Sequence, residues 1–459
     1  MNVGSSKKAT LFIVTMISFV VPFLDTSVAI ALPSIAEEFS MSAVLTGWVA
    51  TSFLLAGAVS LLPFGRFADI HGRKRIFIYG VLVFTLASLI CAISTSAISL
   101  ISFRVLQGIG SAMIFSTGVA ILISVFPANE RGRILGINVA AVYIGLSLGP
   151  FGGGFLVQHL GWRSIFLVTI PISFAVIALV LWKLKGEWAE AKGESFDRIG
   201  FIIYSLSLIA IMYGFSLLPD MLGLSLVLLG VLGIFTFVQW EKKAESPIFN
   251  VSLFRNNATF AFSNLAALFN YSANFAVIFL LSLYLQYIKG FSPQIAGLIL
   301  VAQPIVMAIF SPFAGKLSDR IEPRIVASIG MALTLVGLLS FAFLTEVTGV
   351  WFIIIILIIL GFGFALFSSP NANAVMSSVE KKFLGVASAT LATMRMTGQM
   401  FSMGIVMIVF AIYIGRVQIT PEYYPPFLIS AKVAFIIFTA LCFGGIFALL
   451  ARGRAKGIA

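Results

Sequence analysis

The chain has 459 residues, of which 60% are hydrophobic and only 10% are charged, whereas soluble domains carry about 25% charged residues. This composition excludes an ordinary soluble domain and indicates a membrane protein. We interpret the net charge of +12 as a sign of membrane orientation and of contact with anionic lipid, not of nucleic acid binding.

Fourteen apolar stretches are long enough to cross about 30 Å of hydrocarbon as helices. The first is too long for the apolar core of a signal peptide and lacks a small-residue cleavage site, so we expect it to be retained. The predicted spans are 11–33, 46–65, 76–95, 99–126, 134–157, 164–184, 199–218, 222–240, 258–287, 293–315, 324–344, 349–376, 384–414 and 432–451.

Charge placement predicts the orientation of these spans. With both termini in the cytoplasm, most of the 29 basic residues fall in cytoplasmic loops or tails. The exceptions are Arg163, Lys289, Arg416 and Lys432 in outer loops, and Arg104 and Arg395 within spans. Such a bias is typical of a multi-pass protein of the cell membrane with cytoplasmic termini.

Asp25 is the acidic residue that falls inside the first predicted span. An ionised carboxylate in that position costs about 2.5–3.5 kcal/mol on insertion scales. We therefore expect it to face a cavity, to find a partner, or to carry a proton. A structural alternative is that Asp25 only bonds neighbouring polar groups and holds the helix in place.

A charged loop follows the second span and recurs after the tenth. The first copy runs from Gly65 to Arg75, and the second from Gly315 to Arg324. This duplication predicts two similar six-helix bundles packed side by side, with a substrate site at their interface. We place the N-terminal bundle at 1–190 and the C-terminal bundle at 256–459. The segment 191–255 holds two additional helices, or alternatively one re-entrant hairpin that would reduce the total to twelve spans.

Polar residues in the fourth span form a second candidate site. Arg104 lies about five residues into the span and is the natural partner for Asp25, because a guanidinium stays charged and can influence a neighbouring acid. The alternative is an arginine that extends to the lipid headgroups. Gln107 is one turn further along the same span.

The fifth span carries glycines at every fourth position. Gly145, Gly149 and Gly153 share one helix face, where small residues let another helix approach closely, and Pro150 can kink the span. We predict a tightly packed interface that moves during transport, although ordinary close packing would need the same residues.

The C-terminal half supplies polar groups without acids inside its spans. We predict that some line the substrate cavity, whereas others only form interhelical hydrogen bonds. The candidates for the cavity are Gln107 from the first half together with Asn270, Asn274, Asn371, Arg395 and Gln399.

Four stretches resemble motifs of the major facilitator superfamily. Residues 65–75 are similar to its loop signature, and residues 104–110 to its fourth-helix motif. Residues 24–33 resemble the first-helix motif of the fourteen-span drug:proton antiporters, and residues 145–153 the fifth-helix motif associated with antiporters. The resemblance covers essentially the whole chain, but the chain lacks the second membrane carboxylate of some drug pumps, which makes divalent cationic drugs poor candidates.

The resemblance implies a proton-coupled exporter of hydrophobic or amphipathic drugs, including monocationic ones, that works by alternating access. It assigns proton coupling to Asp25 and Arg104, and implies that Asp69 braces the cytoplasmic gate near the span that begins at Leu384. The alternative is that the basic residues of this loop only set the orientation of the protein in the membrane. The residues that it implies in gating or conformational change are Gly65, Asp69, Gly72, Arg73, Gly145, Gly149, Pro150, Gly153 and Asp319.

Two other functions stay open at this stage. One is transport of an endogenous metabolite or lipid-like compound, including anionic ones, with Arg104 or Arg395 as the counter-charge; the other is a membrane sensor that does not transport. An enzyme is not expected, because the sequence has no phosphate-binding loop or nucleophile elbow. We expect no metal site and no cofactor, with the proton gradient as the energy source, and a monomer whose partners are protons, lipids and a small-molecule substrate.

Overall fold

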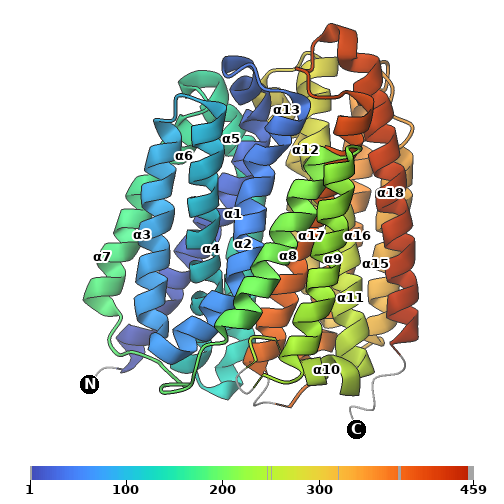
Figure 1. Cartoon of the computed structure of the whole chain (residues 1–459). Helices are drawn as coiled ribbons and strands as arrows, with labels where there is room; N and C mark the ends of the chain where they lie inside the picture. Colours follow the sequence, from blue (N-terminus) through green and yellow to red (C-terminus); the bar gives the residue numbers. More distant parts are fainter. Residues whose placement is uncertain (1–2, 245–246, 250, 319, 381–383, 453–459) are drawn as a thin grey trace.

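The computed structural model describes residues 3–244, 247–249, 251–318, 320–380 and 384–452. Within these residues, fourteen helical segments are long and apolar enough to cross a membrane. The sequence-based prediction of an all-helical membrane protein with fourteen spans is therefore confirmed. The first helix begins and the last helix ends at the same end of the molecule, which we call the terminal face, and the other end is the opposite face (Figure 1).

The first six spans form one bundle, in blue to blue-green in Figure 1. Helix α4 packs between α2 and α3, and α1 packs along α5. The helices are α1 (Val3–Glu38), α2 (Ala43–His71), α3 (Arg73–Ala92), α4 (Ala97–Val125), α5 (Ala128–Leu160), and the pair α6 (Ser164–Leu167) and α7 (Thr169–Lys183), which together make one span.

The last six spans form the other bundle. Its core packs α11 against α17 and α18, and α16 against α14 and α15. Two of these spans are interrupted helices. The elements are α11 (Ala258–Asn274), α12 (Ala276–Leu283) and η1 (Tyr284–Ile288) in one span, α13 (Pro293–Leu300) and α14 (Ala302–Ser318) in the next, then α15 (Pro323–Phe341), α16 (Val350–Ser377), α17 (Leu384–Tyr413), η3 (Pro421–Tyr423) and α18 (Tyr424–Ala451).

Two further helices, α8 (Arg198–Leu217) and α9 (Met221–Glu241), lie between the bundles in sequence and are followed by the short α10 (Val251–Asn256). Each of the two is long enough to cross a membrane, so the structure favours two full spans over one re-entrant hairpin. Helix α8 packs against α2 and α17, and the Tyr204 hydroxyl donates to the carbonyl oxygen of Ala58 on α2 at 3.1 Å. The domain limits near residues 190 and 255 stay predictions.

Several predicted spans are shorter than the observed helices, and the first and the last show the reasons. The last begins at Tyr424 rather than at residue 432, because Pro425 and Pro426 occupy its first turn, where a missing backbone N–H costs nothing. The first runs to Glu38 rather than to residue 33, since a helix continues past the apolar segment into polar sequence.

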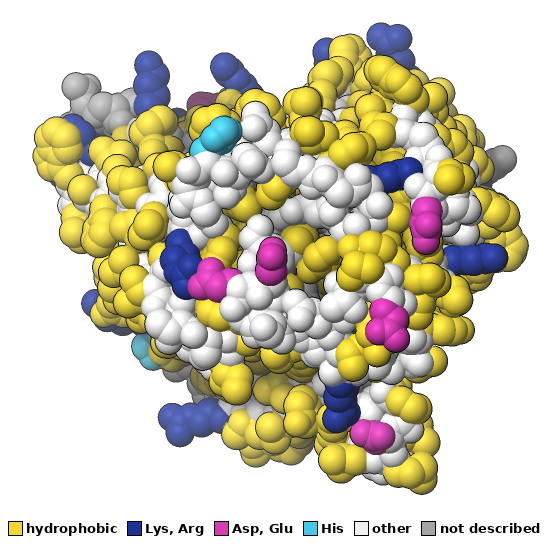
Figure 2. All heavy atoms as spheres, turned by 90° about the horizontal axis from the view of Figure 1, so that it is seen from above, with side chains coloured by type: hydrophobic (Ala, Val, Ile, Leu, Met, Phe, Trp, Pro, Cys, Tyr) yellow, Lys and Arg dark blue, Asp and Glu magenta, His cyan; other side chains and the backbone are white. Residues whose placement is uncertain are grey.

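Hydrogen bonds join the two bundles near the opposite face. The Ser282 hydroxyl donates to the carbonyl oxygen of Ala29 at 2.7 Å, and Gln286 Nε2 donates to that of Ile30 at 3.0 Å. The Ala43 backbone N–H donates to the carbonyl oxygen of Val417 at 2.9 Å. Figure 2 shows this face from outside, with scattered basic and acidic side chains among apolar and neutral ones.

Candidate functional site: a central cavity and a buried ion pair

A cavity of about 170 Å³ lies between the two bundles. Helices α1, α2, α4 and α5 line it on one side, and α11, α12, α14, α16 and α17 on the other. Its lining is mainly apolar with a few polar groups, which is typical of sites for small organic molecules. The aromatic and methionine side chains of this lining are Phe53, Phe115, Tyr143, Tyr271, Phe275, Phe279, Phe364, Met307, Met396 and Met403.

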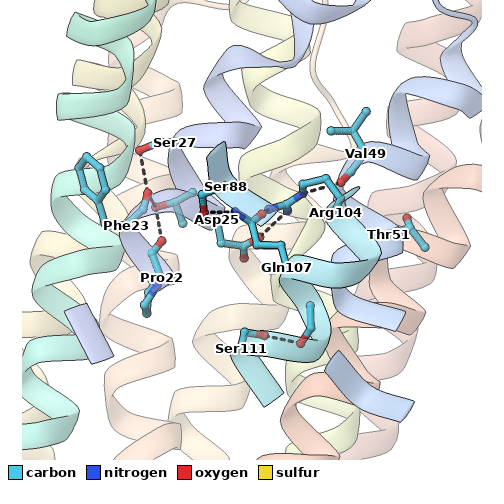
Figure 3. A network of polar contacts seen from close by, with 12 residues as sticks. Pro22, Phe23, Asp25, Ser27, Val49, Thr51, Ser88, Arg104, Gln107 and Ser111 are labelled. Atoms are coloured by element: carbon cyan, nitrogen blue, oxygen red, sulfur yellow. Dashed lines mark hydrogen bonds and ion pairs between the residues drawn. The ribbon is translucent and has the colours of Figure 1, made fainter. Parts of the chain in front are cut away.

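Asp25 reaches this cavity from α1 and forms an ion pair inside the bundle. Its Oδ1 lies 3.3 Å from Nη2 of Arg104 on α4 (Figure 3). The Asp25 side chain is 12% exposed, whereas that of Arg104 is completely buried. The contact predicted between these two residues is therefore present, and Arg104 does not extend to the lipid headgroups.

Arg104 is held by several groups besides Asp25. Its Nε donates to the carbonyl oxygen of Val49 at 3.0 Å, and its Nη1 donates to Oε1 of Gln107 at 2.5 Å. The guanidinium carbon also lies 4.3 Å from the ring centre of Phe53. Because these contacts do not involve Asp25, the guanidinium can keep its place when the carboxylate changes its charge.

Gln107 belongs to this polar network rather than to the cavity wall. Its Nε2 donates to the Ser88 hydroxyl at 2.7 Å (Figure 3). That hydroxyl donates to the carbonyl oxygen of Phe84 at 2.7 Å. The network thus connects α1, α2, α3 and α4 around one fixed cation. Sequence alone could place Gln107 beside Arg104 but not identify Ser88 as its partner.

The glycine face of α5 packs directly against α1. A Cβ atom at Gly145 would lie 2.4 Å from the carbonyl oxygen of Phe19, and one at Gly149 would lie 1.8 Å from Oγ1 of Thr26. At Gly153 the added atom would lie 2.6 Å from Cβ of Ser27. The predicted close approach is therefore observed, and its partner is the helix that carries Asp25.

The same stretch of α5 also contacts the second bundle. A Cβ atom at Gly297 on α13 would lie 2.0 Å from the carbonyl oxygen of Pro150, and one at Gly154 would lie 2.5 Å from that of Pro293. Glycines therefore allow a close approach of α5 to α1 on one side and to α13 on another. It links the helix of Asp25 to the opposite bundle.

The loop between α2 and α3 is bonded to the linker of residues 184–197. Gly72 has φ of +115°, a conformation that favours glycine, and a Cβ atom there would lie 2.5 Å from Cδ of Glu187. Arg73 pairs with Asp69 at 2.7 Å and donates to both carboxylate oxygens of Glu190 at 2.8 and 3.0 Å.

Backbone bonds reinforce this attachment. The Arg73 N–H donates to the carbonyl oxygen of Trp188 at 2.8 Å, and the Ala191 N–H donates to that of Asp69 at 3.0 Å. Arg66 also forms an ion pair with Glu194. Bracing of Asp69 against the span that begins at Leu384 stays a prediction, because Arg73 and Ala191, which bond Asp69, lie in the first bundle and the linker.

The structure gives less support for two other residues implied in gating, Gly65 and Asp319. A Cβ atom at Gly65 would meet Cβ of Ser116 at 3.7 Å, an ordinary contact distance. Asp319 lies outside the described residues. Further along the same loop, Arg324 pairs with Glu322 at 3.4 Å. Burial lowers the pKa of Arg452, just beyond the last span, to about 10, which leaves this guanidinium charged at neutral pH.

The structure separates the residues predicted to line the cavity into two groups. Asn274, Arg395 and Gln399 line it. Asn270 and Asn371 are not among the lining residues, and neither is Gln107; Asn371 Nδ2 instead donates to the carbonyl oxygen of Ser263 at 3.0 Å. Sequence analysis missed Tyr143, whose hydroxyl lies 2.9 Å from that of Ser368 across the bundle interface, and Gln303. Aromatic residues are spread along the whole chain, so no local signal identified those of the cavity.

Comparison with known proteins identifies the family. The sequence profile of the Major Facilitator Superfamily matches residues 14–240 and 264–457. The chain belongs to this superfamily of transporters. This confirms the family suggested by the sequence motifs.

Several curated members of the superfamily are similar over most of their length. The riboflavin transporter RibZ of Clostridioides difficile (strain 630) is 29% identical over 444 residues, 96% of each chain. Multidrug resistance protein Stp of Mycobacterium tuberculosis (strain CDC 1551 / Oshkosh) is 30% identical over 82% of this chain and 71% of that protein. The tetracenomycin C resistance and export protein of Streptomyces glaucescens is 28% identical over 89% and 77%.

A solved structure shares the fold. It is a bacterial homologue of the human lysosomal transporter Spinster in an inward-facing and unoccupied conformation. The TM-score is 0.64 with 17% sequence identity, and the match covers 98% of this chain and 99% of the other. The family match and the fourteen membrane-spanning helices together make this chain a multi-pass transporter of the cell membrane.

Proposed function

We propose that this member of the superfamily exports hydrophobic or amphipathic compounds in exchange for protons, by alternating access. The observation that carries this proposal is the Asp25–Arg104 ion pair, in which the carboxylate faces the central cavity. An acid inside a membrane protein is costly and usually functional. Names among the relatives that refer to drug resistance and export support the substrate class.

Asp25 would carry the proton, and Arg104 would respond to its charge. When Asp25 is ionised, its attraction to the fixed guanidinium holds α1 against α4. Protonation removes the negative charge and weakens that attraction, which is strong where little water is present. The carboxyl group then becomes free to move with α1 while Arg104 keeps its bonds to Val49 and Gln107.

A short path connects this event to the closure between the bundles. Ala29, one helical turn beyond Asp25, accepts the hydrogen bond of Ser282, and Ile30 accepts that of Gln286. A rotation or shift of α1 would therefore strain two bonds that close the opposite face. Helix α5, in contact with α1 through its glycines, would transmit the same movement to α13.

The terminal face would lie in the cytoplasm, as the placement of basic residues predicts. A cavity closed at the opposite face would then receive its substrate from the cytoplasm. We propose a monomer that uses the proton gradient without a cofactor, with anionic lipids around its basic loops and no interaction with nucleic acid.

A second candidate is transport of an endogenous metabolite. It is favoured by Arg395, a cation in the cavity lining, and by the relative named as a riboflavin transporter, which matches over 96% of both chains. Riboflavin therefore belongs among the test compounds.

Proton flux in proteoliposomes tests the proposal. Vesicles with an acidic interior would hold the wild type or Asp25→Asn and receive lipophilic cations, neutral amphiphiles, organic anions or riboflavin. We expect compound-triggered proton release by the wild type and none by Asp25→Asn, with both proteins folded by size-exclusion chromatography. Normal proton-dependent flux in the variant would contradict the role of Asp25. Absence of proton flux with every one of these compounds would contradict antiport.

A further inference from the structure

The charges of the central cavity do not balance. Asp25 and Arg104 neutralise one another, and Arg395 also lines the cavity. Among the described residues, the structure places no carboxylate within ion-pair distance of Arg395. The three side chains together therefore leave one positive charge in the cavity when Asp25 is ionised.

Arg395 lies between the two bundles, beside an aromatic ring. It extends from α17, and its guanidinium carbon lies 5.5 Å from the ring centre of Phe115 on α4 of the other bundle. Gln399, one turn further along α17, lines the same cavity. A planar guanidinium beside an aromatic ring can bind a carboxylate with two hydrogen bonds while an aromatic ligand stacks nearby.

Two neutral side chains in the lining lack partners. Both side-chain polar atoms of Asn274 are buried without a hydrogen bond, and so is Oε1 of Gln303. Asn274 is 6% exposed and Gln303 4% exposed. Buried polar atoms are usually hydrogen-bonded, and an unpaired one calls for a ligand or an ordered water. These amides lie on α11 and α14 of the same bundle as Arg395.

We propose that the cavity selects planar aromatic compounds that carry an acidic or carbonyl-rich head, with Arg395 as the counter-ion and Asn274 and Gln303 as hydrogen-bonding partners. The inference rests on the proposed function in taking this cavity as the transport site. It replaces the sequence-based expectation of monocationic substrates. It also separates the counter-ion, Arg395, from the proton carrier, Asp25, so substrate and proton need not compete for one carboxylate.

A series of probes that differ only in the head group tests this selectivity. The probes are 4-(1-pyrenyl)butanoate, its butanamide and 1-pyrenylbutylammonium, and pyrene fluorescence reports binding to purified protein in nanodiscs. Empty nanodiscs correct for partition into lipid. We expect the wild type to bind the acid about ten- to a hundredfold more tightly than the ammonium compound, which corresponds to the free energy of a hydrogen bond to a charged group. The amide should bind with an affinity between those of the other two probes.

Variants assign the preference to the named residues. Arg395→Gln should weaken binding of the acid at least tenfold and leave the ammonium probe unchanged or tighter, whereas Arg395→Lys should keep the order. Asn274→Ala should weaken the acid and the amide alike. The control is Arg416→Gln, which changes an arginine 59% exposed beyond α17 that pairs with Asp220 at 3.3 Å.

Two results would contradict the proposed preference for an acidic head group. Equal or tighter binding of the ammonium probe by the wild type, or an unchanged order in folded Arg395→Gln, would overturn the inference. Binding is measured without a proton gradient. Failure of proton coupling in vesicles would therefore leave this order intact, and loss of the order would leave proton coupling untouched, so the two proposals fail separately.

Discussion

Arg73 and Glu190 are joined by two hydrogen bonds, of 2.8 and 3.0 Å, that attach the linker between α7 and α8 to the loop between α2 and α3. Arg73 is 9% exposed and Glu190 68% exposed. The guanidinium also bonds Asp69 and the Ser124 hydroxyl. The basic loop is therefore more than an orientation signal, because its central arginine organises four chain segments at the terminal face.

Glu190→Gln should loosen the linker while leaving the fold intact. Because Glu190 is mostly exposed, we expect a loss of only about 0.2–1 kcal/mol in the free energy of unfolding. Trypsin cleavage at Lys185 or Lys192 should become several-fold faster. Glu422→Gln, an exposed change near the opposite face, is the control. Unchanged cleavage would show that the backbone bonds and the contacts of Glu187 and Glu194 hold the linker without Glu190.

The ion pair in the first bundle predicts a coupled pattern of stability. Arg104→Gln removes the cation and leaves the Asp25 carboxylate without its partner, which should cost about 3–5 kcal/mol. Adding Asp25→Asn should restore part of this loss, because the unpaired charge is gone. Thermal unfolding of the two single variants and the double variant measures the interaction energy. Additive effects would mean that the pair contributes no interaction.

Sequence analysis predicted the spans, the contact of Asp25 with Arg104, and the shared face of the α5 glycines. Each depends on local information: apolar length, the cost of a charge in lipid, and the spacing of a helix. The partner of the glycine face could not be predicted, because nothing in residues 145–153 indicates whether α1 or another helix faces them.

The linker contacts were missed for a related reason. Glu187, Glu190 and Glu194 occur in a charged segment that resembles any solvated loop, and only the folded chain brings them to residues 66–74. Asn270 and Asn371 were placed in the cavity because they are polar and lie in spans. A polar residue in a span can equally face a neighbouring helix, and rotation of the helix about its axis decides between the two.

The glycine face predicts a strong contrast between two alanine substitutions in one helix. Gly149→Ala would place a Cβ 1.8 Å from Oγ1 of Thr26 and 2.7 Å from the carbonyl oxygen of Phe23, so α1 and α5 must separate. We expect a cost of about 1–3 kcal/mol and loss of transport. Gly136→Ala is the matched control, because no heavy atom lies within 4 Å of its added Cβ. Equal stability and transport of the two variants would contradict the proposed role of this interface.

The contact of Gly297 with Pro150 predicts a change in conformation rather than only in stability. A Cβ at Gly297 would lie 2.0 Å from the carbonyl oxygen of Pro150, and this backbone atom cannot rotate away. Gly297→Ala should therefore push α13 from α5 and open the opposite face. Spin labels at Ile98 and Val347, exposed by 74% and 89%, report the separation of the two bundles there.

We expect the distance distribution between these labels to shift to longer values in Gly297→Ala. Gly349→Ala is the control, since its added Cβ meets nothing within 4 Å. If the added methyl group opens the opposite face, the hydrogen bonds of Ser282 and Gln286 to α1 must break as well. The combined variant Ser282→Ala and Gln286→Ala should therefore produce a shift in the same direction. A distance that stays unchanged in folded Gly297→Ala would mean that the α5–α13 contact does not control closure.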